Sequence, residues 1–463
     1  MTLINHSASI IILTIVAIYI LITAYLSYKW SGSSNSDFMQ GSKGISYIVV
    51  AVMIFSNYNG IMAVIGTPQR AFTSGVAASW SMFAAAIGFF LYGCFFVKKL
   101  YNTGSFTISG AIRKKYGRST QLLVSIIMIY AMLMLNLNTY ISGASVLHEI
   151  LNTSLPLSML LIAIVSTIYF SIGGMKSISK TTMIHTFMKY LGVIIILVVA
   201  LLMTHGLHPM ITKLPKFYFS TTGKIGSATI IGWILTSIGA IFSTQTIAQA
   251  ISSTKSAKDA QKAAFGAALL VIPFGIALGL IGVAAKYLFP TLSDLYALPV
   301  FLSHMNTFWA SLSSIGLLAG VFVGVSSCGL AIVALVVNDF YVPHWKPEPQ
   351  KQLKVTHIIS IVVGLLPLIF MFYTPNILAL SFFAKALRVS IAIVAVMAFY
   401  LPFFNATSVA NTALIITTVL TTAWYILGNS WGIDDTYIAI LTPLIVMVIG
   451  QFIFKINHRQ KLD

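Results

Sequence analysis

The chain has 463 residues, of which 58% are hydrophobic and only 8% are charged, and its mean hydropathy is +0.93. A soluble domain of this size needs far more polar surface, so the composition excludes a soluble globular protein and indicates a polytopic membrane protein. The formal net charge of +18 would suggest a nucleic-acid partner in a soluble chain. Here we expect it to mark membrane topology and to favour anionic lipid, with no nucleic-acid partner.

Hydrophobic runs predict thirteen membrane helices, and the first run has no preceding basic segment or cleavage site, so we expect it to be retained. The runs are residues 8–28, 45–68, 74–97, 120–147, 156–172, 182–204, 226–250, 264–285, 310–337, 355–373, 377–400, 408–428 and 436–454. Nineteen of the 27 Lys and Arg residues then fall on one side, five on the other, and three within spans. This asymmetry predicts a multi-pass protein of the inner (cytoplasmic) membrane with an external amino terminus and a cytoplasmic carboxyl terminus.

Polar residues interrupt two of the predicted spans. The second span carries turn-forming residues from Ser56 to Gly60, and the seventh is interrupted between Trp233 and Ala240 and continues as a polar run from Ser243 to Gln249. Hydrocarbon cannot satisfy unwound backbone, so such a break persists only where it lines a protein-enclosed cavity or binds something. Broken helices of this kind are typical of secondary transporters, although a glycine kink packed on neighbouring helices is the alternative for the first break alone.

The two breaks open two blocks of five spans each, residues 45–205 and 226–400. Because five is odd, the blocks have opposite orientations in the membrane, which predicts an inverted repeat with its binding site between the breaks. Residues 1–44 would form an extra helix and a linker, and residues 401–463 two further helices and a basic tail.

Several polar side chains are candidates for contact with a solute. Tyr58 and Asn59 lie in the first break, Gln245 follows the second, and Asn136 lies in a span rich in amides and hydroxyls. Interhelical hydrogen bonds explain such residues about equally well.

Two cations within one span favour an acidic solute. Lys385 and Arg388 are three residues apart and therefore share one helical face. A charge at the membrane centre costs about 3 kcal/mol or more, so two cations without an acidic partner predict an anionic or zwitterionic ligand, which Arg binds by its fork. The alternative is that both side chains snorkel or donate to backbone carbonyls.

Short motifs between about Asp37 and Tyr341 resemble the solute:sodium symporter family. They are the stretch from Gly66 to Gly75, the basic segment from Thr107 to Gly117, the double glycine Gly173-Gly174, the stretch from Gln249 to Ala260, Ala297-Leu298-Pro299, and Asn338-Asp339-Phe340-Tyr341. The resemblance implies an all-α protein of about thirteen transmembrane helices, with a LeuT-type 5+5 inverted repeat whose first and sixth core helices are broken. It also implies alternating access and symport of a small solute with sodium.

The same resemblance implies a sodium site that this sequence holds only in degenerate form. The backbone carbonyls would belong to Ser56 and Asn59, but the family's Asp corresponds to Thr182, and its two hydroxyl positions fall on Val323 and Gly324. The hydroxyls of Ser326 and Ser327 follow about one helical turn later. The candidate ion-binding residues are Ser56, Asn59, Thr182, Ser326 and Ser327.

Few side chains within the membrane spans could carry a proton that is coupled to transport. All nine map to loops or helix ends, so no carboxylate is expected inside the membrane. His185 is then the candidate for proton coupling, and the alternative is a histidine that bonds a neighbouring helix. Coupling to sodium, coupling to protons and uncoupled transport all remain open.

Nothing in the sequence favours catalysis. There is no phosphate-binding loop, catalytic triad or His-Glu motif, and the two cysteines lack metal-ligand spacing, so we expect no enzyme activity and no cofactor beyond Na+ or H+ as coupling ion. We therefore expect a secondary active transporter for a small organic solute, working as a monomer or weak homo-oligomer. A transporter-like solute sensor and a channel are the alternatives.

Overall fold

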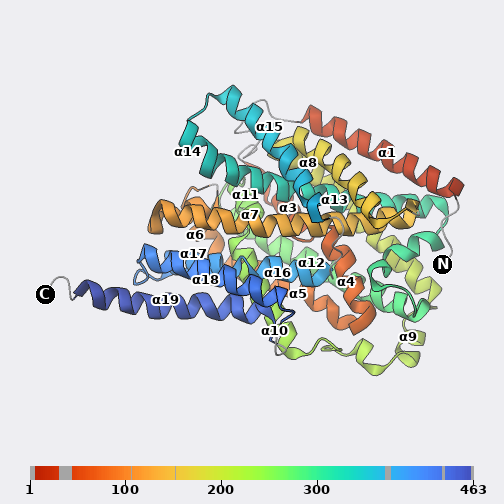
Figure 1. Ribbon diagram of the computed structural model, residues 1–463. Coiled ribbons are helices and arrows are strands. Elements are labelled where there is room, and N and C mark those ends of the chain that lie inside the picture. Colours follow the sequence, from red (N-terminus) through yellow and green to blue (C-terminus); the bar gives the residue numbers. More distant parts are fainter. Residues whose placement is uncertain are drawn as a thin grey trace.

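The computed structural model describes residues 6–30, 44–105, 107–151, 153–370, 377–429 and 433–459, and these form a bundle of helices (Figure 1). The predicted linker lies almost wholly in residues 31–43 and the end of the basic tail in residues 460–463, so both fall outside the described residues. The stretch around Gly173-Gly174 is helical, but its surroundings are likewise not described.

The amino-terminal half of the bundle contains the first broken helix. Its elements are α1 (His6–Lys29), α3 (Tyr47–Tyr58), α4 (Ile61–Ser74), η1 (Val76–Ser79), α5 (Trp80–Leu91), η2 (Tyr92–Phe96), α6 (Val97–Asn102), α7 (Ile108–Leu151) and α8 (Leu155–Met203). The basic segment of α7 meets the rest of that helix at Gly117, whose positive φ of 81° marks a kink between the two parts.

The carboxyl-terminal half contains the second broken helix. Its elements are α9 (His208–Lys213), η3 (Lys216–Phe219), α10 (Ser227–Ser243), α11 (Gln245–Ser252), α12 (Ala257–Leu288), η4 (Asp294–Tyr296), η5 (Pro299–His304), α13 (Thr307–Leu335), η6 (Val336–Tyr341), α14 (Val342–Trp345), α15 (Pro349–Leu365), η7 (Leu366–Phe370), α16 (Ile377–Ala386), α17 (Val389–Tyr400), α18 (Thr407–Ile426) and α19 (Asp435–Arg459).

Ten helical segments of the described chain are long and apolar enough to cross a membrane, and two bent pairs bring the number to twelve. The apolar segment Leu155–Ile168 is shorter and coincides with the fifth predicted span. Each of the thirteen predicted runs therefore corresponds to a helical segment, although the one that matches the fifth run is shorter than a full membrane span.

The first break lies where the sequence predicts it. Helices α3 and α4 meet at 53°, because Asn59 and Gly60 leave the helical conformation (ψ of 61° and −171°). Gly60 also lies against α13, since a Cβ there would be 3.7 Å from the Gly324 Cα. The break thus lies within the bundle, where neighbouring protein rather than lipid surrounds it.

The predicted position of the second break is wrong. Helix α10 continues through Thr236 to Ala240 and ends at Ser243, and Thr244 is the extended residue (ψ 122°) at which α10 and α11 meet at 50°. Hydroxyls and glycine do not by themselves break a membrane helix, because they permit close helix packing and hydroxyls can donate to carbonyls one turn back. Gly239 accordingly packs against Val389.

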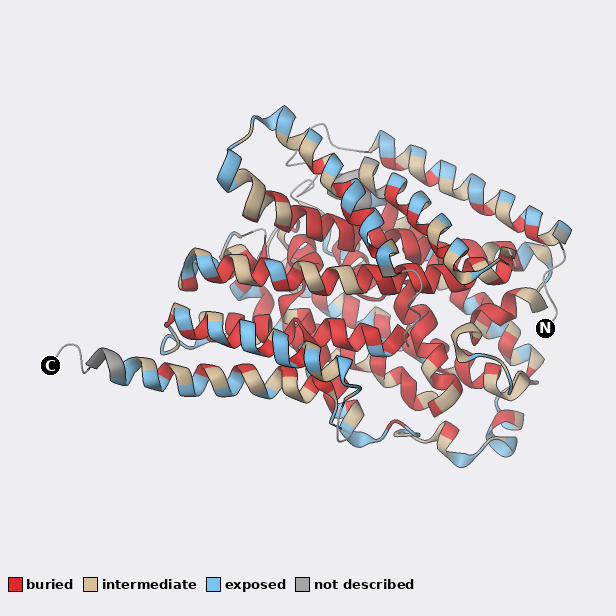
Figure 2. Cartoon of the chain, in the orientation of Figure 1, coloured by how far each residue is buried: buried red, intermediate tan, exposed pale blue. Residues whose placement is uncertain are grey.

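Helix α13 forms the middle of the bundle. Figure 2 shows that buried residues gather in the central helices, while α1 and α19 expose much of their surface. α13 is almost entirely buried and packs against α8, α7, α1 and α15. Glycines allow the closest approach, because Gly316 of α13 and Gly192 of α8 lie against each other's backbone.

We predict that Gly316→Ala destabilises the protein. A Cβ at Gly316 would lie 2.3 Å from the Met188 carbonyl oxygen and 3.0 Å from the Gly192 Cα, so the two helices must separate. Overpacking of this kind costs about 1–3 kcal/mol, measurable as a lower melting temperature of the purified protein in detergent. Gly232→Ala is the control, because a Cβ at Gly232 would lie 3.7 Å from its nearest neighbouring atom. Equal melting temperatures for the two variants would contradict the prediction.

A buried carboxylate joins the other end of α13 to α7. Asp339, in η6, accepts hydrogen bonds from Ser109 Oγ (2.6 Å), Gln121 Nε2 (2.7 Å) and Ser125 Oγ. Arg118 donates to the main-chain oxygen of Asp339. This set of contacts, the Asp339 network, connects the basic segment of α7, its membrane span and α13.

Candidate solute and ion site

A small closed cavity lies between the two helix breaks. Its free volume is about 10 Å³, roughly the room that one water molecule needs. Residues from both broken helices, α7, α13 and the α16–α17 turn line it: Asn57, Tyr58, Met62, Met132, Leu135, Thr244, Thr246, Cys328, Lys385 and Arg388. Segments more than 300 residues apart in sequence therefore meet at one point.

Arg388 joins the α16–α17 turn to the second break. Its side chain is buried, with Nε donating to the Ala384 carbonyl (3.1 Å) and Nη1 donating to Thr244 Oγ1 (2.7 Å). Thr244 is itself the residue at which the helix breaks, and its hydroxyl donates to the Ala240 carbonyl. Since the guanidinium has five N–H groups, further donors remain for a ligand.

Lys385 is buried beside Arg388 and contacts aromatic rings. Its Nζ lies 4.3 Å from the ring centre of Phe382 and 5.0 Å from that of Tyr58. Within the described part of the chain, neither Lys385 nor Arg388 has a carboxylate partner. Lys385 does not snorkel to an interface, whereas Arg388 does donate to one backbone carbonyl, as the alternative expectation allows.

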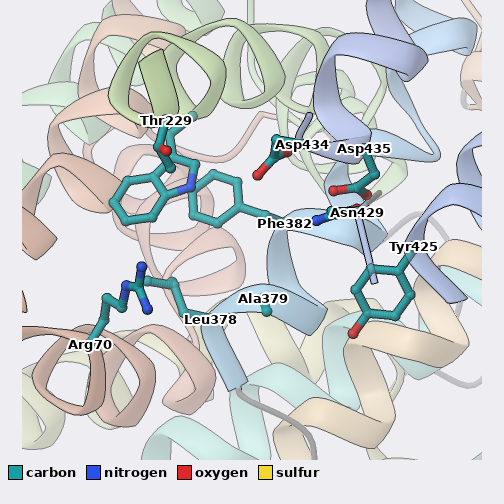
Figure 3. Close-up of a pocket in the computed structure, with 10 residues that line it drawn as sticks. Arg70, Thr229, Leu378, Ala379, Phe382, Tyr425, Asn429, Asp434 and Asp435 are labelled. Atoms are coloured by element: carbon teal, nitrogen blue, oxygen red, sulfur yellow. The ribbon is translucent and has the colours of Figure 1, made fainter. Parts of the chain in front are cut away.

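A second, open pocket of about 260 Å³ is lined in part by Phe382, whose ring contacts Lys385 of the closed cavity (Figure 3). Arg70 of α4 faces it from one side, and Asp434 and Asp435 at the start of α19 face it from another. Phe382 lines the pocket and contacts Lys385, and its ring stacks on that of Trp233 at 4.8 Å between centres. We call these two rings the aromatic pair.

The first break holds a cation that belongs to the protein itself. Lys189 of α8 is fully buried, and its Nζ donates to the Asn59 carbonyl (2.8 Å) and to Ser56 Oγ (3.0 Å). The rings of Phe55 and Phe274 lie 4.9 and 5.9 Å from the same nitrogen. Of the two residues whose carbonyls the resemblance assigns to sodium, Asn59 thus accepts from Lys189 through its carbonyl and Ser56 through its hydroxyl.

The three hydroxyls predicted to bind the ion differ in their hydrogen bonding. Ser327 Oγ donates to Asn57 Oδ1 (2.7 Å), which ties α13 to α3. The hydroxyls of Ser326 and Thr182 are buried and have no hydrogen-bond partner among the described residues. Thr182 precedes Lys189 by two helical turns and lies on the same face of α8.

The predicted solute contacts divide into two groups. Tyr58, Lys385 and Arg388 line the closed cavity, but Asn136 and Gln245 are not among its lining residues. Gln245 accepts a hydrogen bond from the Ile108 main-chain N–H through Oε1 (3.1 Å). Both side-chain amide atoms of Asn136 are buried without a partner in the described structure. A solute role for these two residues and for Asn59 stays a prediction.

His185 faces α1 rather than the cavity. Its Nδ1 lies 2.6 Å from the Tyr19 hydroxyl, and its ring packs edge-on against that of Tyr19. This contact is the interhelical hydrogen bond that the sequence allows as the alternative, and proton coupling through His185 stays a prediction.

Sequence reasoning missed the roles of Lys189, Thr244 and Asn57 in this site. A signal existed for Lys189, because it is one of three cations within predicted spans and lies seven residues after Thr182. The polar run that starts at Ser243 was the signal for Thr244.

The bundle with its two broken helices has the LeuT-type fold, as the solved structures that it matches show. The structure matches that of a Na+-coupled sialic acid symporter with a TM-score of 0.82 and 17% identity, over 96% of this chain and 98% of that one. It also matches Mhp1, a nucleobase-cation-symport-1 family transporter, with a TM-score of 0.61 and 16% identity, over 91% and 94% of the two chains.

The chain belongs to the sodium:solute symporter family, whose sequence profile matches residues 38–416. Among curated relatives, human high affinity choline transporter 1 is 23% identical over 60% of this chain and 50% of its own length. The sodium/glucose cotransporter of Vibrio parahaemolyticus is 23% identical over 62% of this chain and 57% of its own length. The matches thus span little more than half of these relatives.

Proposed function

We propose that the protein is a secondary active transporter that carries a small anionic or zwitterionic organic solute across the membrane by alternating access. The observation that carries the proposal is the pair of buried cations, Lys385 and Arg388, in the closed cavity between the two helix breaks. The acidic group of the solute would bind between these two side chains.

Electrostatics supports an acidic ligand at this point. Burying a charge is costly unless it is paired and hydrogen-bonded. The aromatic rings around the Lys385 ammonium offset part of that cost, by about 2 kcal/mol or more when desolvated, and Arg388 has only two oxygen partners in the described structure. A carboxylate or a similar acidic group would supply the missing charge, and Arg can bind it with two parallel hydrogen bonds.

The two neighbouring cavities support alternating access. The open pocket leads to Phe382, and the closed cavity with Lys385 lies directly behind that ring. The aromatic pair would then act as the gate on this side, which the charge asymmetry of the loops predicts to be external. Movement of Phe382 would join the two spaces into a path for the solute.

Uptake by reconstituted protein tests the proposal. Purified protein in proteoliposomes is given a panel of labelled organic acids, zwitterionic amino acids and neutral sugars, with sodium and pH gradients imposed separately. We expect saturable uptake of at least one anionic or zwitterionic compound and none of the neutral sugars. Uptake of neutral or cationic solutes only would contradict the proposal. Binding without uptake would indicate a sensor, and ion conductance too fast for alternating access a channel.

A further inference from the structure

We propose that the ε-ammonium group of Lys189 is the permanent occupant of the cation site at the first helix break, and that this chain therefore works without sodium. The inference concerns the coupling of the transport proposed above and rests on that function for its physiological meaning. The occupancy itself is a property of the protein that can be measured without knowing the solute.

The oxygen atoms around Lys189 have the chemistry of a site for a monovalent cation. The last carbonyls of a helix have no partner within the helix, and the carboxyl end of a helix carries partial negative charge. Helix α3 ends at Tyr58, and the Asn59 carbonyl just beyond it accepts a hydrogen bond from Lys189 Nζ. Ser56 Oγ, one turn earlier, accepts the second. A neutral carbonyl and a hydroxyl bind an ammonium group as readily as a metal cation.

The position of Lys189 on α8 lets its side chain reach this site. Helical side chains point toward the amino terminus, so Lys189 extends back along the face that also carries Thr182. The resemblance gives Thr182 the place of a carboxylate in other family members, so that negative charge is missing here, and Lys189 puts a positive charge on the same face of α8. Both features disfavour a free cation, because the first removes an attractive charge and the second repels the ion.

Helix α13 provides the space for the lysine side chain. A Cβ on Gly320 would lie 3.4 Å from Lys189 Cδ and 3.5 Å from the Ile61 main-chain N. Lys189 therefore passes between the first break and α13, the two elements between which the resemblance places sodium. A methyl group at position 320 would be in van der Waals contact with the Lys189 side chain.

A sodium ion cannot easily share the site with the ammonium group. Two unit charges about 4 Å apart at the effective dielectric of a protein would weaken binding of the second roughly a thousandfold. No carboxylate contacts Lys189 in the described parts of the chain, so nothing there offsets this repulsion. The buried hydroxyl of Thr182 has no hydrogen-bond partner among the described residues.

Sodium binding to the purified full chain tests the proposal directly. Bound 22Na+ and the melting temperature are measured in NaCl and, at equal ionic strength, in KCl. We expect no stoichiometric 22Na+ binding by the wild type and the same melting temperature in both salts. The double variant T182D/K189A restores an acidic ligand and removes the ammonium, so it should bind about one sodium per chain and melt higher in NaCl. Lys180→Ala, on the exposed surface of the same helix, is the control and should behave as the wild type.

Stoichiometric sodium binding by the wild type would overturn the proposal, and this result does not depend on whether any variant folds. A folded double variant that binds no sodium would overturn it as well, because the break would then not be a cation site. Once the uptake panel has identified a solute, its initial uptake by the wild type should be unchanged when N-methyl-D-glucamine replaces sodium. If the panel finds no solute, the proposed function fails while the sodium measurements still decide this inference.

Discussion

Replacement of Arg388 by Ala is expected to reduce transport of the acidic solute by about 30-fold or more in kcat/KM. Truncating one partner of a buried, hydrogen-bonded charge pair costs about 2–5 kcal/mol. Arg388 also holds Thr244 at the second break, so the variant loses both the charge and the alignment of the break. The measurement is the initial rate of uptake into proteoliposomes over a range of solute concentrations.

Further variants separate binding from folding. Arg388→Lys keeps the charge but loses the planar fork, so it should fall between wild type and Arg388→Ala. Arg113→Ala, on an exposed face of the basic segment of α7, should leave uptake unchanged. The test also uses a solute analogue in which an amide replaces the acidic group. The Arg388→Ala substitution should lower kcat/KM less for this analogue than for the acid. Equal losses for acid and amide would show that Arg388 does not recognise the charge.

Replacement of Asp339 by Ala is expected to destabilise the protein by several kcal/mol. Its carboxylate accepts hydrogen bonds from Ser109, Gln121 and Ser125, and hydrogen bonds to a charged group contribute about 1.5–3 kcal/mol each. The variant also leaves the buried Gln121 Nε2 without the Asp339 acceptor, whereas Ser109 and Ser125 keep second acceptors in Thr107 Oγ1 and the Gln121 carbonyl. The melting temperature in detergent measures the loss, and hydrogen exchange should become faster in the first turns of α7.

Two controls bracket the Asp339 prediction. Asp339→Asn retains the shape and one acceptor oxygen, so it should lose less stability than Asp339→Ala. Glu348→Ala changes an exposed acidic residue and should leave the melting temperature unchanged. A melting temperature of Asp339→Ala equal to that of Glu348→Ala would mean that the Asp339 network does not hold α7 to α13.

The sequence predicts the helices of this fold well, because crossing a membrane imposes a length and an apolar composition that can be counted. The first break was equally readable, since Asn59 and Gly60 both favour non-helical backbone. The second break was misplaced by several residues. Thr236, Ser237 and Gly239 are compatible with a helix when neighbours pack closely, and only the tertiary structure shows that α10 continues to Ser243.

The sequence predicts the candidate site less well than the helices, because the chemistry of the site depends on contacts between distant helices. Lys385 and Arg388 stand out as charges in an apolar span, and they do line the closed cavity. Lys189 stands out equally, but the 130 residues that separate it from Asn59 conceal the hydrogen bond between them. His185 shows the opposite case, since its hydrogen-bond partner in α1 could not be identified from either span.

The aromatic pair has a consequence for the speed of the transport cycle. Phe382 lines the open pocket and contacts the Lys385 ammonium, and its stacking on Trp233 contributes about 0.5–1.5 kcal/mol beyond the area it buries. The stacking by itself therefore shifts the equilibrium between stacked and parted rings by only about 2- to 13-fold. The hydrogen bonds of the Asp339 network, just beyond the end of α13, contribute several times more free energy than this stacking. We expect the solute to exchange quickly with the open pocket, so that turnover is limited by rearrangement at the Asp339 end of the bundle.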